Sequence, residues 1–143
     1  MSKTVWITGA SSGIGREFAR RHARLGFRLI LTARRTDRLE ALAAELTAKH
    51  STFCRILPAD LEQGSECARL CEALADERID IFINNAGFGV CGSFLETSGE
   101  KELSMAKVNV LAMHQLFKFA VKKMEAQGFG TVLLSLIHIS EPT

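Results

Sequence analysis

The chain of 143 residues contains no tyrosine, one tryptophan and two prolines, and it has no long apolar run. A membrane-spanning helix needs about 20 consecutive apolar residues, so none is expected. Residues 1–3 lead directly into a short apolar segment, without the h-region of a secretory signal peptide. We therefore expect a cytoplasmic protein that does not associate with membranes.

Cysteine occurs at four positions but never in a C-x-x-C pair. Cys67 and Cys71 are four residues apart and would share one helix face, yet no partner histidine or cysteine completes a metal site. We expect no metal ion. Cys54, Cys67, Cys71 and Cys91 are interpreted as small buried hydrophobic side chains in a reducing compartment.

The net charge of +2 gives no argument for nucleic-acid binding, but the charge is unevenly distributed. Residues 16–38 contain eight arginines and two acidic residues, so this stretch carries +6 and the rest of the chain −4. A solvated helix face explains Arg20, Arg21 and Arg24. Attraction of an anionic ligand fits Arg34 and Arg35 best.

Apolar runs with strand character alternate with segments of helical periodicity. Strands are expected at 4–8, 27–33, 53–57, 79–83 and 131–134. The helix at about 100–127 is apolar on more than one face, which favours contact with its own sheet and with a partner chain. Apolar strands joined by helical crossovers are typical of a parallel sheet covered on both faces. The predicted fold is α/β, a Rossmann-type doubly wound parallel sheet truncated after about five strands.

Apolar spacing also predicts which helix faces contact the sheet. The first helix would end at Gly26, and the second would begin with a capping box formed by Asp37 and Glu40. The inward-facing residues would be Ile14, Phe18, His22 and Leu25 in the first helix, Leu39, Leu42 and Leu46 in the second, and Cys67, Leu70, Cys71 and Leu74 in the third.

A glycine-rich turn at residues 8–15, Thr-Gly-Ala-Ser-Ser-Gly-Ile-Gly, links the first strand to the first helix. Glycine permits positive φ and lets a ligand approach the backbone closely. The free N–H groups at a helix start attract a phosphate. The spacing G-x-x-x-G-x-G is a weak signal alone, because many tight turns use glycine. Its position between a strand and a helix favours a phosphate site.

Polar or glycine-rich residues follow three further strands as well. Arg34 follows the second strand, Asp60 the third, and residues 84–87 (Asn-Asn-Ala-Gly) the fourth. In an open parallel sheet, ligands bind beyond the C-terminal strand ends. Four strand ends with this chemistry indicate one shared ligand site.

In order and spacing, these segments resemble the N-terminal part of the short-chain dehydrogenase/reductase (SDR) family. The matching segments are T-G-A-S-S-G-I-G at 8–15, D-L at 60–61, N-N-A-G at 84–87 and V-N-V at 108–110. The resemblance implies an NAD(P)-binding Rossmann domain, incomplete, at residues 1–133. It also implies an oxidoreductase that transfers hydride between nicotinamide and a small-molecule carbonyl/alcohol substrate.

The resemblance further implies roles for single residues. Asp60, with Leu61 beside it, would accept a hydrogen bond from the adenine amino group, although a helix N-cap is an alternative role. Asn109 corresponds to the family's catalytic asparagine, which kinks the long helix and holds a water of the proton relay; a satisfied core amide is the alternative. Asn84 would tie adjacent strands together. The pyrophosphate and adenosine ribose would lie along Gly9, Ser11, Ser12, Gly13, Ile14 and Gly15, and the nicotinamide ribose along Asn85, Ala86 and Gly87.

The end of the second strand bears on the choice of cofactor. NAD-selective enzymes place an acidic residue there, which bonds the ribose 2′-OH. This chain has Arg34 and Arg35 instead, and its first carboxylate is Asp37. A guanidinium binds a 2′-phosphate bidentately, so we expect NADP to be preferred over NAD, with Arg34 as the main contact and Arg35 flanking it.

The chain departs from the family in its catalytic residues and in its last segment. The family uses a serine and a Y-x-x-x-K pair, so this chain, without tyrosine, is expected to bind NADP without turnover. Residues 134–143 resemble a translated sequencing adaptor, and we expect native sequence to end near Leu133, with no catalytic role for Ser135, His138 or Ser140. The parent protein is expected to be a homo-oligomer. The alternatives are a non-catalytic NADP-binding sensor or scaffold, or another phosphate-binding α/β domain.

Overall fold

The computed structural model describes residues 2–135, which form a five-stranded parallel sheet of order β3-β2-β1-β4-β5. The strands are β1 (Thr4–Thr8), β2 (Arg28–Thr32), β3 (Cys54–Ile56), β4 (Ile81–Asn84) and β5 (Thr131–Leu134). Every strand pairing is parallel, and β1 is central, with Thr8 level with Thr32 and Asn84. The sheet confirms the predicted α/β fold, and each predicted strand is found to within two residues at either end.

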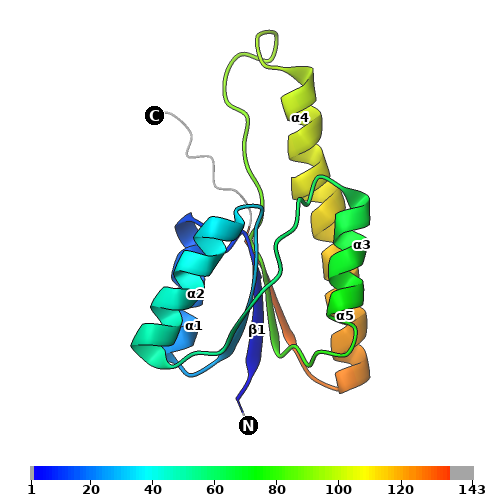
Figure 1. The fold of residues 1–143 in the computed structure, drawn as a ribbon. Coiled ribbons are helices and arrows are strands. Elements are labelled where there is room, and N and C mark those ends of the chain that lie inside the picture. Colours follow the sequence, from blue (N-terminus) through cyan, green and yellow to red (C-terminus); the bar gives the residue numbers. More distant parts are fainter. Residues whose placement is uncertain (1, 136–143) are drawn as a thin grey trace.

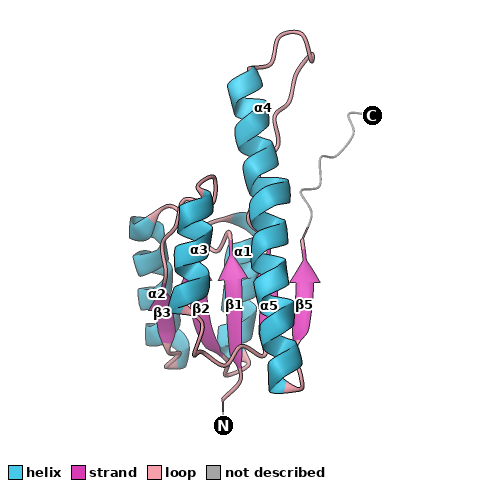
Figure 2. Ribbon diagram, turned by 90° about the vertical axis from the view of Figure 1, so that its right-hand side faces the viewer, coloured by secondary structure: helices cyan, strands magenta, loops and turns pink. Residues whose placement is uncertain are grey.

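Helices cover both faces of the sheet (Figures 1 and 2). On one face lie α1 (Gly13–Arg24) and α2 (Thr36–His50), and on the other lie α3 (Gly64–Ala73) and α5 (Met113–Gln127). α5 continues a longer helix made of α4 (Gly99–Ala106) and the π-helical segment η1 (Lys107–Ala112). α4 and the loop before it project beyond the C-terminal edge of the sheet (Figure 2). Among residues 2–135, no helix is long and apolar enough to cross a membrane.

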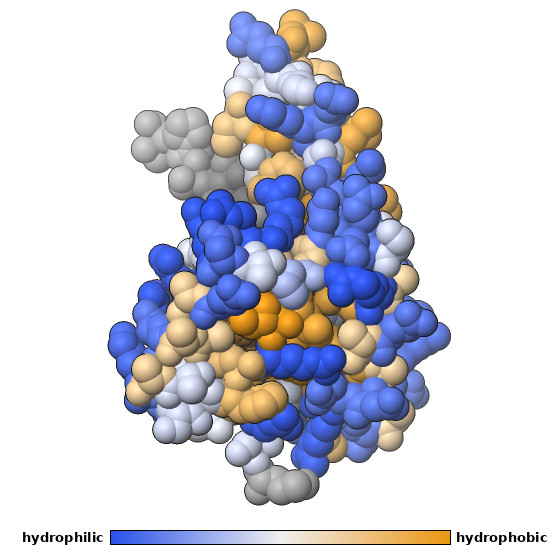
Figure 3. All heavy atoms as spheres, in the orientation of Figure 1, coloured by the Kyte–Doolittle hydropathy of each residue, from blue (hydrophilic) through white to orange (hydrophobic). Residues whose placement is uncertain are grey.

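The core is split by the sheet into two clusters because adjacent residues of a strand point to opposite faces. Val5 and Ile7 pack toward α1 and α2, whereas Trp6 packs toward α3 and α5. The Trp6 ring stacks on Phe82 at 4.2 Å between centroids and is met edge-on by Phe119. Figure 3 shows apolar side chains in the middle of one face of the molecule, between the two helical layers.

The predicted inner face of α1 is wrong. Ile14 and Leu25 are 60% and 64% exposed, and Phe18 and His22 are only half-buried. The helix instead buries Gly15, Ala19 and Ala23 against the sheet. These small residues let the helix backbone approach β1 and β2 closely, and they contribute little to an apolar periodicity. The helix does stop before Gly26, whose φ is +86°.

The capping box predicted for α2 is also absent. The N-cap is Arg35, no side chain caps it, and the Asp37 carboxylate binds the Arg35 guanidinium instead. The predicted inner face of this helix is confirmed, because Leu39, Leu42 and Leu46 are all buried.

Only one of the four cysteines fits the prediction of small buried side chains. Cys67 is buried, Cys54 and Cys71 are half-buried, and Cys91 is exposed in the loop after β4. Burial raises the pKa of Cys71 to about 11, so its reactive thiolate is scarce at neutral pH. The segment interpreted as non-native is 134–143. Its residues 136–143, which include His138 and Ser140, lie outside the described residues.

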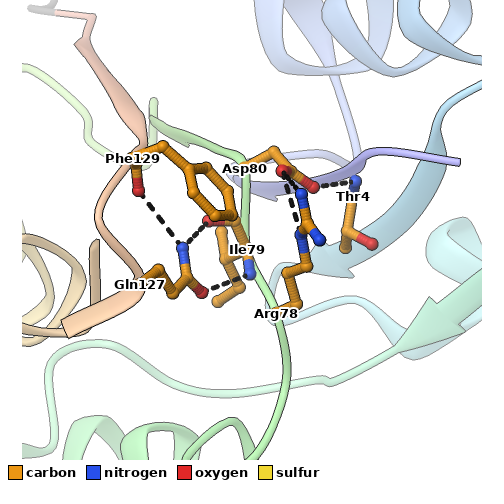
Figure 4. A network of polar contacts seen from close by, with 6 residues as sticks. All are labelled: Thr4, Arg78, Ile79, Asp80, Gln127 and Phe129. Carbon is orange, nitrogen blue, oxygen red and sulfur yellow. Dashed lines mark hydrogen bonds and ion pairs between the residues drawn. The ribbon is translucent and has the colours of Figure 1, made fainter. Parts of the chain in front are cut away.

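A polar network closes the edge of the sheet opposite the predicted ligand site (Figure 4). One Asp80 carboxylate oxygen accepts the Thr4 backbone N–H at 2.8 Å, and the other lies 3.3 Å from the Arg78 guanidinium. The Gln127 amide accepts the Ile79 N–H at 3.0 Å and donates to its carbonyl at 2.9 Å. The start of β4 is thereby bound both to β1 and to the end of α5.

We expect Asp80→Ala to destabilise the protein by about 2 kcal/mol, because the buried Thr4 N–H would lose its acceptor. Arg78→Ala is the matched control and should cost less than about 1 kcal/mol, since the Arg78 side chain is 54% exposed. Urea unfolding followed by the fluorescence of Trp6, the single tryptophan, measures both values. Equal losses in the two variants would contradict a special role for the Thr4 contact.

Candidate functional site

A cavity of about 360 Å³ lies at the C-terminal edge of the sheet, where the ends of β1, β2, β3 and β4 meet. Its walls combine glycine-rich backbone, guanidinium groups, two carboxylates and a few apolar side chains. The lining residues are Gly9, Ser11, Ser12, Ala33, Arg34, Arg35, Arg38, Ala59, Asp60, Leu61, Glu62, Ala86, Gly87, Phe88 and Val108. The four strand ends singled out in the sequence therefore contribute to one cavity.

The turn after β1 lines this cavity with Gly9, Ser11 and Ser12. Gly9 takes a φ of +66°, and a Cβ there would lie 3.0 Å from the Ala86 backbone. α1 begins after Ser12, whose side chain does not cap it, and its first turn has no acidic residue. The positive end of the α1 dipole is therefore free of negative side chains of its own, which suits an anionic group.

Gly15 packs behind the turn and does not line the cavity. A Cβ at this position would overlap the Gly9 carbonyl oxygen and lie 2.6 Å from the Asn85 Nδ2 atom. Asn85 Nδ2 donates to that same carbonyl at 3.4 Å. Absence of a side chain at residue 15 is what lets α1, the turn and the loop after β4 meet.

The buried Thr8 hydroxyl holds the ends of β1 and β4 together. It donates to Asn84 Oδ1 at 3.0 Å and accepts the backbone N–H groups of Asn85 and Ala86, each at 3.0 Å. Asn84 also donates from Nδ2 to the Met113 carbonyl at 3.2 Å. Asn84 thus ties β4 to β1 and to α5.

Asn109 lies in the middle of η1 and binds the loop after β4. Its Oδ1 accepts the Phe88 N–H at 3.1 Å, and its Nδ2 donates to the Phe88 carbonyl at 2.7 Å. The family resemblance implies a kink of the long helix near Asn109. The structure has a π-helical segment there, a feature frequent at functional sites. The side chain fixes Phe88, and with it one wall of the cavity.

Three arginines surround the end of β2, but they differ in their partners. The Arg35 guanidinium forms a bidentate pair with the Asp37 carboxylate, at 3.0 and 2.8 Å. This pairing holds the pKa of Asp37 below its usual range, mainly through the hydrogen bonds. Arg34 and Arg38 take part in none of the ion pairs between residues 2–135.

The end of β3 supplies carboxylates. Asp60 Oδ1 accepts the backbone N–H of Glu62 at 3.1 Å, and the Asp60 carbonyl accepts that of Gln63. Asp60 therefore caps a turn, whereas α3 itself begins after Gln63. The helix N-cap considered for Asp60 is not formed.

Most of the cofactor residues named from the sequence line the cavity, but four do not. Gly13 and Ile14 are exposed at the start of α1, and Gly15 and Asn85 pack behind the cavity wall. Six further lining residues were not assigned to the cofactor from the sequence: Ala33, Arg38, Ala59, Glu62, Phe88 and Val108. A signal existed for Arg38, which ends the basic stretch and stands one helical turn after Arg34.

The parallel sheet with a glycine-rich turn, an uncapped helix start and cationic side chains at adjoining strand ends is a Rossmann-type α/β arrangement. Residues 3–135 match the family model of the short chain dehydrogenases, and the chain belongs to this family.

Relatives and solved structures agree with this assignment. The chain is 34% identical to a very-long-chain 3-oxoacyl-CoA reductase of Podospora anserina, over 92% of this chain and 41% of that protein. A short-chain dehydrogenase from Sphingobium yanoikuyae, solved with NADPH, matches 92% of the chain at a TM-score of 0.88 and 38% identity. An alcohol dehydrogenase from Thermococcus sibiricus, solved with 5-hydroxy-NADP, matches 94% of it at a TM-score of 0.86 and 32% identity. The chain spans 52% and 57% of these two solved chains.

Proposed function

We propose that the parent protein is an NADP-dependent oxidoreductase that transfers hydride between the nicotinamide ring and a carbonyl/alcohol substrate. One observation carries the cofactor assignment: Arg34, without an acidic partner among residues 2–135, lines the cavity at the end of β2, and the nearest following carboxylate is bound to Arg35. A solved relative with NADPH and another with 5-hydroxy-NADP support it.

The glycine-rich backbone and the guanidinium groups of the cavity lining support this proposal. Gly9, Ser11 and Ser12, which lie just before the start of α1, would hold the pyrophosphate. Arg34 would bind the 2′-phosphate, and Asp60 the adenine amino group. Ala86 and Gly87, held by the Thr8 network, would pass along the nicotinamide ribose. The bound cofactor would supply the hydride, and the chain would orient it.

We propose further that this chain binds the cofactor without turning over a substrate. The family's tyrosine acid is lacking, and positioned proton transfer contributes about 10²- to 10⁴-fold in rate. Asn109 would keep its positioning role through Phe88. Purified chain incubated with NADPH and a panel of aldehydes and ketones should leave NADPH absorbance unchanged.

Replacing Arg34 by alanine should weaken NADPH binding about tenfold or more, since a charge-assisted contact to the phosphate would be lost. NADH binding should change little, because NADH carries a 2′-hydroxyl. Titrations following NADPH and NADH fluorescence give both affinities. Arg24→Ala on the outer side of α1, away from the cavity lining, is the control. An equal loss for NADH and NADPH would contradict the proposed contact.

The alternative function is that of a non-catalytic NADP-binding sensor or scaffold. The two proposals differ in the gene beyond Leu133, where a Y-x-x-x-K pair supports the enzyme and its absence supports the sensor.

Exposed apolar residues along the long helix, Val110, Leu111 and Val121, support a homo-oligomeric parent. From the sequence we also propose that the protein is cytoplasmic and that it does not bind nucleic acid.

A further inference from the structure

The two edges of the sheet differ in their protection against pairing with another chain. β3 forms one edge, and its Arg55 guanidinium is paired with the Glu77 carboxylate at 2.8 Å. A charged side chain on an edge strand is one means by which proteins prevent edge-to-edge association. β5 forms the other edge (Figure 2), and its sequence Thr-Val-Leu-Leu contains neither a charged residue nor a proline. The β5 edge therefore has no charge that would oppose a further strand.

Backbone hydrogen-bonding groups of β5 point toward this open side. The N–H groups of Thr131 and Ser135 donate to carbonyl groups of the β4 segment, at 2.9 and 3.1 Å. Because the backbone groups of successive strand residues alternate between the two sides of a strand, those of Val132 and Leu134 point away from β4. No strand of residues 2–135 lies on that side. These N–H and C=O groups are thus available to a partner strand.

Leucine side chains lie on both faces of the same edge. Leu133 is level with Ile83, on the side of the sheet where α1 and α2 lie, and it is 41% exposed. Leu134 lies on the opposite face, together with Val132, and is 39% exposed. A partner strand would remove apolar surface of both leucines from water, which favours association.

We propose that the 143-residue chain forms a two-fold symmetric dimer in which β5 pairs antiparallel with β5 of a second copy. The backbone groups of a strand edge are satisfied by another strand, and a second copy presents an identical edge. Since residues 131–135 carry no charge, the two edges meet without like-charge repulsion. β5 supplies none of the residues that line the cofactor cavity, so this inference is independent of the proposed NADP preference.

The directions of the backbone groups restrict the register of this pairing. In an antiparallel pair, opposite residues share one face, and residues whose backbone groups point to the partner exchange hydrogen bonds. A two-fold axis at Leu133 meets both conditions. Val132 would exchange hydrogen bonds with Leu134 of the second copy, on either side of a central Leu133–Leu133 contact, and Thr131 would lie opposite Ser135. Leu134 and Ser135, interpreted as non-native, thus extend the edge in the chain as it stands.

Analytical ultracentrifugation of the full chain over a series of concentrations tests the dimer. Leu133→Lys should raise its Kd about tenfold or more, because two ammonium groups would face each other in place of two leucines. Val121→Lys is the matched control, since Val121 is also 41% exposed but lies on α5, and it should leave the dimer intact. Thermal unfolding confirms that both variants are folded. A chain that stays monomeric, or a dimer weakened by Val121→Lys and not by Leu133→Lys, would overturn the proposal.

Disulfide trapping tests the register of the two strands. Cys91→Ser is the background variant, because Cys91 is the exposed cysteine of the chain. In this background Leu133→Cys should form a disulfide-linked dimer on mild oxidation, since residues at the two-fold axis would have Cα atoms about 4.5 Å apart, within disulfide range. Leu134→Cys is similarly exposed but would face Val132, so it should cross-link far less on a non-reducing gel. Equal cross-linking at both positions, or none at position 133, would overturn the proposed pairing.

Discussion

Gly15→Ala should destabilise the protein by at least about 3 kcal/mol and abolish tight cofactor binding. The new methyl group would overlap the Gly9 carbonyl oxygen, which is backbone and cannot move aside like a flexible side chain. To remove this overlap, either α1 must move away from β1 or the turn must change its conformation. Either movement disturbs the turn that lines the cavity with Gly9, Ser11 and Ser12. Urea unfolding and an NADPH titration measure the two effects.

Gly64→Ala is the matched control for this substitution. Gly64 also lies in the first turn of a helix, but it is exposed, and a Cβ there would meet no atom of the described part of the chain within 4 Å. Its replacement should leave stability unchanged or raise it by up to about 1 kcal/mol, since alanine favours helix. Similar losses at both positions would show that the close packing of α1 on the turn is not the cause.

Thr8→Val should cost about 2 to 4 kcal/mol, although the two side chains have nearly the same shape. Valine removes one donor and one acceptor and leaves three groups without their partner: Asn84 Oδ1 and the N–H groups of Asn85 and Ala86. The loop after β4 would loosen, so NADPH binding should weaken together with stability. Chemical denaturation followed by Trp6 fluorescence measures the stability.

Thr32→Val supplies the comparison on the neighbouring strand. Thr32 is level with Thr8 in the sheet and equally buried. Among residues 2–135, however, its hydroxyl accepts only one hydrogen bond from a side chain, that of Trp6 Nε1 at 3.0 Å. The same substitution should therefore cost about 1 to 2 kcal/mol. A loss at Thr32 as large as that at Thr8 would contradict the role of the Thr8 hydroxyl as the link between β1 and β4.

The order of strands and helices follows from the sequence because buried parallel strands leave continuous apolar runs. The 4–8 strand, for example, is buried throughout and has the predicted bounds, and Leu39, Leu42 and Leu46 face the core as their spacing requires. The strand ends of a parallel sheet share one edge, so Arg34, Asp60 and Gly87 could be assigned to one site before any geometry was known.

Contacts that depend on close packing or on competing partners could not be predicted in the same way. The α1 interface is made by Gly15, Ala19 and Ala23, whose small side chains give no apolar signal. Asp37 had two possible partners, the start of α2 and Arg35, and the guanidinium is the one it binds. Arg38 enters the cavity only because of the direction in which α2 leaves β2.

The central claim is that the four strand ends form a site for NADP. It is tested most directly by titrating the unmodified 143-residue chain with NADPH and with NADH at the same ionic strength. We expect NADPH to bind at least about tenfold more tightly, a difference of about 1.4 kcal/mol. Equal affinities, or tighter binding of NADH, would contradict the assignment of the Arg34 end of the cavity to a 2′-phosphate.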